Sequence, residues 1–548
     1  QEGFCPNRST SRYLYKLVSK LNEAKRKKLQ AVILFIDFSK AFDSVWVKGL
    51  IVKLHRSGVS GNFLQLLNSF LSHRSISIKL NGRTFKTRLC SIIGLPQGSV
   101  LAPLLFILFV RDIPLSNNIL SSTDMDLFKY ADDGTISAIG PDLFQCQRML
   151  QNSCDALYRW CCQWRLTINC NRNKTEAIVI RMKGVTDDVV DNLPKLMCGT
   201  KTIEYVRKSK VLGLIIDDNL SFQSHASSVL KRCWYDWYRV SKNTNRMRGL
   251  NTHSLTLIFK SVVCSNILYA SPVWLNKQYD SFKRLWSRVI MKLTGSQYHP
   301  ERNVAELSLN MMPLQLQNDL HITKFLLKDL KAADSFTFLL SEIEETEHHY
   351  FSSHIQLAKK WIVWKQSGND TSSPQSHTQL DLDARPAIRT IHLGSILQNP
   401  MLKYTKCSIR SFAFYIWRRY LRHQLPHKPI SQWTSLGCLT PRRSSRLTNS
   451  IVMDFVHGHS LRFGNFRKSV GHSDSDRCLY CGERYDSPEH QLFYCQHFTC
   501  PLREDLLAVI DGNSSDYSWR VLTGPFNEVA CTTLHHLVKW IIHKDNGP

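Results

Sequence analysis

An apolar run rich in branched side chains extends over Ala31–Phe38 and is broken only by Asp37. Its length and composition predict a fully buried strand. Two shorter, partly apolar runs, Met125–Tyr130 and Thr135–Ile139, flank the acidic sequence Asp132–Gly134. This pattern predicts a β-hairpin that carries acidic side chains at its tip.

Helical periodicity fills much of the remaining chain. The run Val100–Val110 predicts a helix that follows a loop rich in glycine and proline. One apolar stripe of an amphipathic helix packing on a sheet is formed by Leu150, Cys154, Leu157, Cys161 and Trp164. Residues 1–205 therefore alternate strands and helices, and residues 227–365 are mainly helical.

The two acidic positions predict metal chemistry. A lone carboxylate such as Asp37 is costly in a buried strand unless it is paired or metal-bound. Asp132 and Asp133 repel each other unless a positive charge lies beside them. Carboxylates from separate segments are what a two-metal phosphoryl-transfer centre needs, because they bridge metal ions about 3.5–4 Å apart. For the hairpin alone, an Asp-Asp-Gly turn chosen for its backbone preferences is the alternative.

The segment Ile93–Leu104 lies between these acidic positions and contains Pro96, Gln97 and Gly98. An amide and a glycine-rich backbone at a helix start suit contact with the sugar, base or phosphates of a nucleotide. A glycine-rich turn before a core helix is the alternative interpretation.

Three segments in this order resemble motifs A, B and C of reverse transcriptases: Phe35–Asp43, Gly94–Pro103 and Tyr130–Asp133. The complete sequences of these motifs are similar to those of non-LTR (LINE-like) retrotransposons of the Jockey or I-like group. Further matches are Gln1–Phe4 with Asn7–Thr10 in the fingers, Trp164, Leu166, Asn169 and Lys174-Thr175 in motif D, and Leu212–Leu214, Asp217, Leu220–Phe222 and His225 in the primer grip. The resemblance covers residues 1 to about 226.

The resemblance implies an α/β right-hand polymerase palm with partial fingers, a mainly helical thumb and a small carboxy-terminal zinc-knuckle domain. The expected boundaries are 1–205 for partial fingers and palm, 206–226 for the primer grip, 227–365 for the thumb and its extension, 366–450 for a linker and basic region, and 451–548 for the zinc-knuckle domain.

Carried over residue by residue, the resemblance also implies site residues. Phe42 lies five positions after Asp37, where the family has an aromatic gate that clashes with a ribose 2′-hydroxyl. The implied set is Asp37, Asp132 and the secondary carboxylate Asp133 for two Mg²⁺, Phe42, Gln97, Gly98 and Arg8 for the incoming nucleotide, and Lys174 for the leaving pyrophosphate.

The chain departs from the family pattern at Cys5, where a basic residue is usual, so Arg8 would hold the triphosphate alone. A second acidic pair, Asp217-Asp218, is interpreted as a turn in the primer-grip hairpin. Because the sequence begins at Gln1 within the fingers motif, we expect the first part of the fingers and an upstream endonuclease to lie outside it.

Charge and cysteine content agree with this reading. The 71 Lys and Arg residues against 44 Asp and Glu residues give a formal charge of +27, which favours binding to phosphate backbones. Seventeen scattered cysteines suggest reduced thiols in a cytosolic or nuclear setting. The resemblance implies a nuclear protein with a cytoplasmic ribonucleoprotein stage. We find no apolar segment of the roughly 18 residues that a membrane helix needs.

A zinc site is predicted near the carboxy terminus by Cys478, Cys481, His490 and Cys495. The Cys-x2-Cys pair and the spacing to His490 and Cys495 provide the ligand types of a tetrahedral site. His497 and Cys500 are nearby substitutes, and unrelated buried thiols are the alternative. We expect the site to support a small domain that grips template RNA or target DNA.

The predicted function is RNA-directed DNA polymerisation by target-primed reverse transcription. The expected partners are template RNA, target or primer DNA and deoxynucleoside triphosphates, with no membrane. Two alternatives are a non-catalytic nucleic-acid-binding relic that keeps the fold and a group II intron-type maturase. The sequence indicates neither the oligomeric state nor which RNA is copied.

Overall fold

The computed structural model describes residues 1–329, 464–510 and 536–540, except for residues 7, 73, 89–92, 116–122, 172, 183, 245–248, 296–301, 303, 304, 307, 308, 310, 489 and 499. The chain separates into two compact units. The first unit includes Gln1–His225 and Pro272–Lys277, and the second includes Ala226–Ser271 and Gln278–Leu327.

The first unit is built on a four-stranded antiparallel sheet with the strand order β4-β5-β1-β6. These strands are β1 (Gln30–Ile36), β4 (Asp124–Tyr130), β5 (Asp133–Gly140) and β6 (Glu176–Ile180). The predicted strand is confirmed as β1, in which every side chain from Ala31 to Ile36 is buried. Both faces of β1 are covered, which is why its apolar run does not alternate with polar residues.

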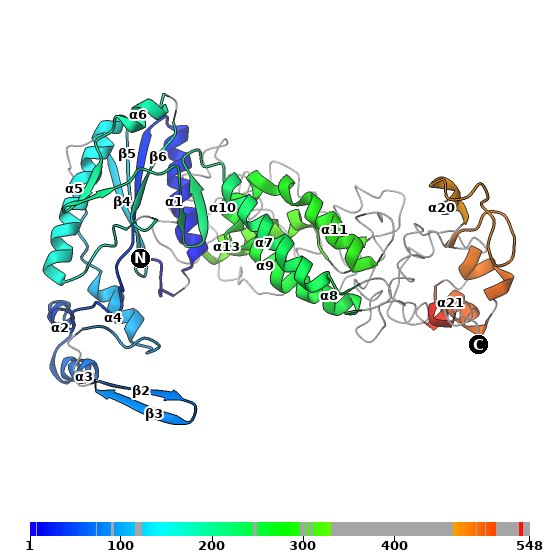
Figure 1. The fold of residues 1–548 in the computed structure, drawn as a ribbon, viewed down its shortest axis with the longest axis horizontal. Helices are drawn as coiled ribbons and strands as arrows, with labels where there is room; N and C mark the ends of the chain where they lie inside the picture. The colour runs from blue at the N-terminus through cyan, green and yellow to red at the C-terminus, as the bar shows by residue number, and fades with distance from the viewer. Residues whose placement is uncertain are drawn as a thin grey trace, which may run out of the picture. The chain divides into compact units, whose positions relative to one another are not determined.

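Two helices cover opposite faces of this sheet, α1 (Thr10–Arg26) and α5 (Leu143–Trp164) (Figure 1). Successive side chains of a strand point to opposite faces. Leu34 and Ile36 pack in the same core cluster as the apolar stripe of α5. On the other face, the Tyr13 hydroxyl of α1 donates a hydrogen bond to Thr135, which pairs with Phe35.

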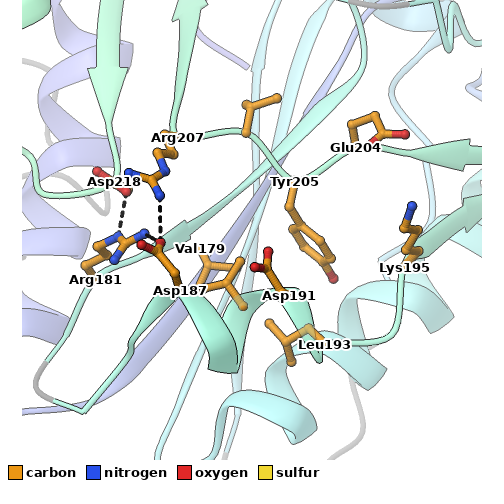
Figure 2. Close-up of a pocket in the computed structure, with 12 residues that line it drawn as sticks. Val179, Arg181, Asp187, Asp191, Leu193, Lys195, Glu204, Tyr205, Arg207 and Asp218 are labelled. Carbon is orange, nitrogen blue, oxygen red and sulfur yellow. Dashed lines mark hydrogen bonds and ion pairs between the residues drawn. The ribbon is translucent and has the colours of Figure 1, made fainter.

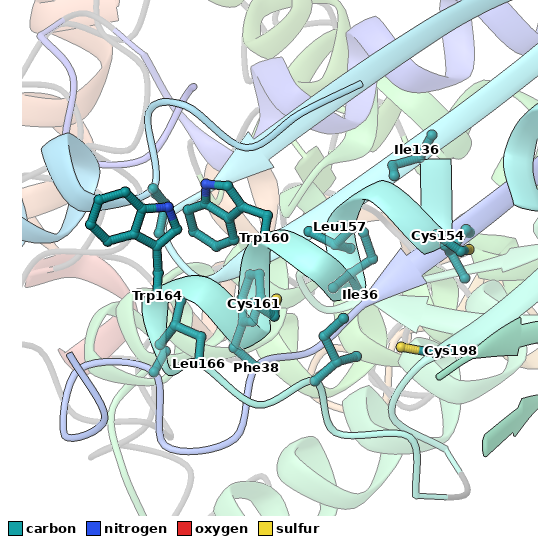
Figure 3. Close-up of a cluster of buried hydrophobic side chains, with 14 of the residues drawn as sticks. Ile36, Phe38, Ile136, Cys154, Leu157, Trp160, Cys161, Trp164, Leu166 and Cys198 are labelled. Carbon is teal, nitrogen blue, oxygen red and sulfur yellow. The ribbon is translucent and has the colours of Figure 1, made fainter. Parts of the chain in front are cut away.

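The predicted stripe of α5 is confirmed, because all five of its residues are buried. Figure 3 shows Leu157, Trp160 and Trp164 packed with Ile36 and Phe38 in this cluster. The Asp142 side chain caps the start of α5 by accepting a hydrogen bond from the Gln145 amide at 2.8 Å. Such a cap satisfies a backbone donor that the helix itself leaves unpaired.

The segment between β1 and β4 lies beyond one end of the sheet (Figure 1). Its elements are α2 (Val47–Arg56), α3 (Gly61–Leu71), the hairpin of β2 (Ser75–Leu80) and β3 (Arg83–Arg88), and α4 (Ala102–Phe109). The helix predicted over Val100–Val110 is therefore confirmed as α4. After β6 follow α6 (Asp187–Asp191) and the hairpin of β7 (Leu196–Cys198) and β8 (Lys201–Ile203).

A separate hairpin occupies the predicted primer-grip segment, formed by β9 (Lys208–Val211) and β10 (Leu214–Asp217). Asp217 and Asp218 lie in a turn, as predicted, in which the Leu220 amide donates to the Asp217 carbonyl at 2.9 Å. This turn follows β10, whereas the turn that joins the two strands lies at residues 212–213. Asp217 ends β10 and accepts hydrogen bonds from the amides of Ser221 and Phe222. Asp218 pairs with Arg181 at 2.7 Å. Both carboxylates are therefore used to hold the chain where it leaves the hairpin.

The second unit is mainly helical over its described residues within 226–271 and 278–327, as predicted for residues 227–365, of which 330–365 lie outside the described residues. Its elements include α7 (Gln223–Ser241), α8 (Thr252–Ile258), a π-helical turn Phe259–Cys264, α9 (Ser265–Leu268), α11 (Lys283–Thr294) and α13 (Leu314–Asp329). Between α9 and α11 lies α10 (Ser271–Gln278), most of which belongs to the first unit. The Phe259 ring contacts both Trp237 and Trp286, which joins α7, the π-helical turn and α11 through one aromatic cluster.

The carboxy-terminal segment contains α20 (Gly464–Ser469), a π-helical turn His490–Tyr494, a short 3-10 helix Gln496–Phe498 and α21 (Pro501–Ile510). The linker and basic region predicted at 366–450 lie outside the described residues. In the part of the chain that the structure describes, no single helix is long and apolar enough to cross a membrane, although the bent pair Thr252–Leu268 and Ser271–Thr294 meets the criteria when counted together.

Candidate active site

Strand pairing brings the two predicted acidic positions together. Ile36 of β1 pairs with Gly134 of β5, so Asp37 follows β1 at the level of Asp133. Asp132 lies in the two-residue turn between β4 and β5. Ala131, the first residue of this turn, has a φ of +56°, which tight hairpin turns require. Three carboxylates from two distant segments therefore meet at one end of the sheet.

The charges of these carboxylates act on one another. Burial and the negative charges of Asp132 and Asp37 raise the pKa of Asp133 to about 6, against the opposing effect of Lys174. Such clustering is unfavourable unless a cation lies among the carboxylates. Oxygen ligands from separate segments are also what Mg²⁺ prefers. The donor set therefore fits the predicted Mg²⁺ ions.

Asp37 is held by the segment that resembles motif D. The Asn169 side chain donates to Asp37 Oδ2 at 2.9 Å, and its backbone amide donates to the Asp37 carbonyl at 2.8 Å. The Asp37 amide donates to Thr175 Oγ1 at 3.3 Å. Lys174 Nζ lies 3.8 Å from Asp37 Oδ2. The predicted Lys174 is thus brought to the carboxylates.

The glycine-rich loop before α4 is tied to the segment after Asp37. The Leu95 amide donates to the Phe42 carbonyl at 2.8 Å. At Gly94, φ is +88° and a Cβ would lie only 2.8 Å from the Asp43 carbonyl oxygen. Glycine is therefore required for the two segments to approach this closely.

Gln97 and Gly98 lie on the exposed part of this loop. The Gln97 side-chain amide donates to Asp43 Oδ1 at 2.8 Å. Gly98 has a φ of +84° and open space where a Cβ would be. The loop therefore presents an amide and an unobstructed backbone to solvent, as contact with a nucleotide requires.

Phe42 is partly buried, and one of its faces is covered. Its ring stacks on that of Phe106 in α4, with centroids 4.5 Å apart and planes 20° apart. Phe106 is completely buried in the core of the first unit. The orientation of Phe42 is therefore supported from the core side.

Arg8 lies against the first residues of the chain. Its guanidinium donates to the Gln1 carbonyl at 2.5 Å and lies 4.0 Å from Glu2 Oε1. Glu2 is buried, where it also pairs with Arg12 at 3.3 Å and Lys16 at 3.0 Å. The role of Arg8 in holding a triphosphate stays a prediction.

Sequence reasoning gave no role to two groups that the structure brings to the site. Asn169 holds Asp37, and the start of the chain packs on the acidic hairpin, where a Cβ on Gly3 would lie 2.5 Å from the Ala131 amide nitrogen. Both lie within segments that resemble reverse transcriptase motifs. That resemblance was the only signal, because nothing in the local pattern identifies their distant partners.

The four predicted zinc ligands come together in the carboxy-terminal segment. Their ligand atoms all lie within 4.8 Å of one another. Cys478 Sγ is 3.9 Å from Cys495 Sγ, and Cys481 Sγ is 3.1 Å from His490 Nε2. A tetrahedral zinc with the usual bond lengths would separate its ligands by roughly 3.3–3.8 Å. The group can therefore hold a metal ion.

Neighbouring groups support this arrangement. Gly482 follows the second cysteine with a φ of +78°, and its amide donates to the Cys478 carbonyl at 3.0 Å. His490 Nδ1 lies 3.7 Å from a Glu483 carboxylate oxygen, a common partner for a metal-binding histidine. The possible substitute His497 instead stacks its ring on that of Tyr480.

A cavity of about 270 Å³ lies elsewhere on the first unit, beside α6 (Figure 2). Arg181 pairs with Asp187 and Asp218, and Arg207 pairs with Asp187 at 2.9 Å. These charges neutralise one another, and we assign the cavity no ligand.

Residues 1–216 match the family described as reverse transcriptase (RNA-dependent DNA polymerase). The chain is 26% identical over 323 residues to the RNA-directed DNA polymerase from mobile element jockey of Drosophila funebris, covering 57% of this chain and 33% of that protein. It is 24% identical over 331 residues to the probable RNA-directed DNA polymerase from transposon BS of Drosophila melanogaster, covering 59% of this chain and 36% of that protein.

A third relative is the probable RNA-directed DNA polymerase from transposon X-element of Drosophila melanogaster, which is 22% identical over 332 residues, 59% of this chain and 35% of that protein. The chain thus spans about a third of the length of these curated relatives. The three motifs, the carboxylates that they bring together and these similarities lead to one conclusion: residues 1–216 match the reverse transcriptase family, and the chain is similar to the RNA-directed DNA polymerases of jockey-like, non-LTR retrotransposons.

Proposed function

We propose that this chain is an RNA-directed DNA polymerase that copies the RNA of a non-LTR retrotransposon into DNA. The observation that carries this proposal is the meeting of Asp37 with Asp132 and Asp133 through the register of β1 and β5. The reaction is attack of a primer 3′-hydroxyl on the α-phosphate of a deoxynucleoside triphosphate, with release of pyrophosphate.

The residues of the chain position the reactants for this step. Two bound Mg²⁺ would activate the attacking hydroxyl and neutralise charge on the phosphates. Asp37 and Asp132 are the principal ligands in this proposal, and Asp133 is secondary. Lys174 is close enough to Asp37, at 3.8 Å, to stabilise or protonate the leaving pyrophosphate.

The incoming nucleotide contacts a second set of residues in this proposal. Gln97 and Gly98 face its sugar, base or phosphates from the loop before α4, and Arg8 holds triphosphate oxygens. The Phe42 ring rejects a 2′-hydroxyl. The primer is nicked target DNA and the template is element RNA, which makes the protein nuclear with a cytoplasmic ribonucleoprotein stage.

Primer extension tests the polymerase proposal. The full chain, with Mg²⁺, an RNA template and an annealed DNA primer, should add deoxynucleotides. Asp37→Ala and Asp132→Ala should each abolish addition, because no neighbour replaces a bridging carboxylate, whereas Asp133→Asn should be milder. RNA binding should change little in all three variants.

The same assay distinguishes the main alternative. A wild-type chain that binds RNA but extends no primer is a non-catalytic relic that keeps the fold. Extension that persists in both alanine variants would instead exclude the two-metal assignment.

We also propose that Cys478, Cys481, His490 and Cys495 bind one Zn²⁺ and that this module contacts template RNA or target DNA. Support comes from the spread of only 4.8 Å among the four ligand atoms and from exposed Arg477 and Lys468 nearby in the sequence. Elemental analysis of the full chain should find about one equivalent of zinc, and Cys478→Ser should lower that content.

A further inference from the structure

Phe4 combines two unfavourable features near the nucleotide site. Its φ of +57° lies in the left-handed region, which bulky side chains rarely adopt. Its side chain is also 58% exposed, although an aromatic ring is stabilised by burial. A strained residue persists only where its surroundings hold it, and such residues cluster at functional sites. Phe4 is therefore a candidate for a role other than folding.

The surroundings of Phe4 hold it against the acidic hairpin. The Glu2 amide donates to the Lys129 carbonyl at 2.8 Å, beside the end of β4. A Cβ on Gly3 would lie 2.5 Å from the Ala131 amide nitrogen, so only glycine permits this approach. The position of Phe4 is thus set by the same turn that carries Asp132.

The Phe4 ring reaches the proposed gate. It meets the Phe42 ring edge to face, with centroids 6.4 Å apart and planes 85° apart. Phe42 also stacks on Phe106, which is completely buried. Phe42 therefore contacts one fully buried core ring, Phe106, and one exposed ring, Phe4.

We propose that Phe4 is a positioning residue for sugar selection: it holds the Phe42 ring where that ring meets the 2′ position of the incoming nucleotide. This inference rests on the proposed polymerase function and on Phe42 as its gate. Steric exclusion of a single hydroxyl depends on small displacements, so a Phe42 ring that loses its Phe4 contact discriminates less well.

A double-mutant cycle tests this inference. The measured quantity is the ratio of kcat/KM for a deoxynucleotide to that for the matching ribonucleotide. Phe4→Ala should lower the ratio by about 2- to 10-fold, the size expected of one aromatic pair contact. In a Phe42→Ala background the same change should have no further effect, because the ring that Phe4 positions is gone.

Three variants separate this role from general structure. Phe4→Tyr keeps the ring and should retain the wild-type ratio. Phe4→Gly also removes the ring, but glycine adopts a positive φ without strain. The ratio for Phe4→Gly should therefore equal the ratio for Phe4→Ala, which assigns the loss to the missing ring and not to backbone strain. Phe63→Ala removes an equally exposed phenylalanine, 58%, from α3 and should leave the ratio unchanged.

The outcomes are distinct. A ratio unchanged by Phe4→Ala, or a loss of equal size with and without Phe42, overturns the inference while leaving the polymerase proposal intact. A wild-type chain that extends no primer overturns both.

Discussion

At the scale of single residues, the candidate site depends on the groups that hold its carboxylates. Asn169 uses its side chain on Asp37 Oδ2 and its backbone amide on the Asp37 carbonyl. A metal ligand that is oriented by a neighbouring hydrogen bond presents its oxygen in one direction. Asn169 thus orients Asp37, although it contacts no substrate in the proposed reaction.

Asn169→Ala should lower primer extension by about 10- to 100-fold, the usual cost of losing a group that orients a metal ligand. The loss should be smaller than that of Asp37→Ala, and higher Mg²⁺ should recover part of it. Asn171→Ala, an exposed position on the same loop, is the matched control. Equal activity of the two variants would contradict a role for Asn169.

His225 makes the stability of the first unit dependent on pH. Its ring is buried edge to face against Trp274, and its Nδ1 accepts a hydrogen bond from the Ile215 amide at 3.4 Å. Burial, with a smaller effect of Lys210, lowers the pKa of His225 to about 4. The unfolded chain therefore binds this proton more readily than the folded chain does.

The free energy of unfolding should consequently be unaffected by His225 above about pH 6.5 and should fall by about 2–4 kcal/mol as pH drops from there toward 4. Urea titrations of the wild type and His225→Phe across this range measure the effect. The variant should lose this part of the pH dependence. An unchanged slope would show that His225 is not responsible.

At the scale of elements, one lysine joins the helix after the nucleotide loop to the acidic hairpin. Lys129 Nζ of β4 donates to the carbonyls of Val110 and Arg111, at 3.0 and 3.4 Å, just beyond the end of α4. The last carbonyls of a helix have no partner within it. Lys129 therefore supplies a donor to the carbonyl of Val110, which caps α4, and to that of the next residue, and it connects α4 to β4.

Lys129→Met should lower the free energy of unfolding by about 1–3 kcal/mol, because it removes the donor of the partly buried Val110 carbonyl. Chemical denaturation measures this cost. Lys201→Met, at an exposed position in β8, should stay within about 0.5 kcal/mol of the wild type. The hydrogen bonds of Lys129 would be dispensable if both variants unfolded alike.

At the scale of the whole molecule, the formal charge of +27 and the proposed zinc module concern nucleic-acid binding more than chemistry. When lysine and arginine side chains bind phosphate backbones, they release the counterions condensed on the nucleic acid. Binding of RNA by the full chain should therefore weaken as salt is added.

Removing zinc should separate binding from catalysis. A zinc-selective chelator, with Mg²⁺ kept in excess, or Cys478→Ser, should weaken the binding of RNA or DNA by the full chain because metal binding contributes to the folding of small metal sites. Extension of a pre-annealed primer at saturating concentration should persist. Asp37 and Asp132 lie in the first unit, whereas the four proposed zinc ligands lie in the second. Cys162→Ser, at an exposed cysteine of α5, is the control. Full binding after the zinc is lost would contradict the proposed role of the module.

The sequence by itself determined the local elements and the types of residue at the site. Continuous or periodic apolar patterns predicted β1, the acidic hairpin and α5. Such patterns suffice because the side chains that share one buried face of a strand or helix lie only a few positions apart in the sequence. The tertiary structure alone decided which distant residues meet. The register of β1 and β5 puts Asp37 beside Asp133, and Asn169 and Gly3 reach the site from other segments. The turn at Asp217-Asp218 shows the same division: its residue types predicted a turn, but its place after β10 and the partners of its carboxylates, Ser221, Phe222 and Arg181, are set by how the chain folds back.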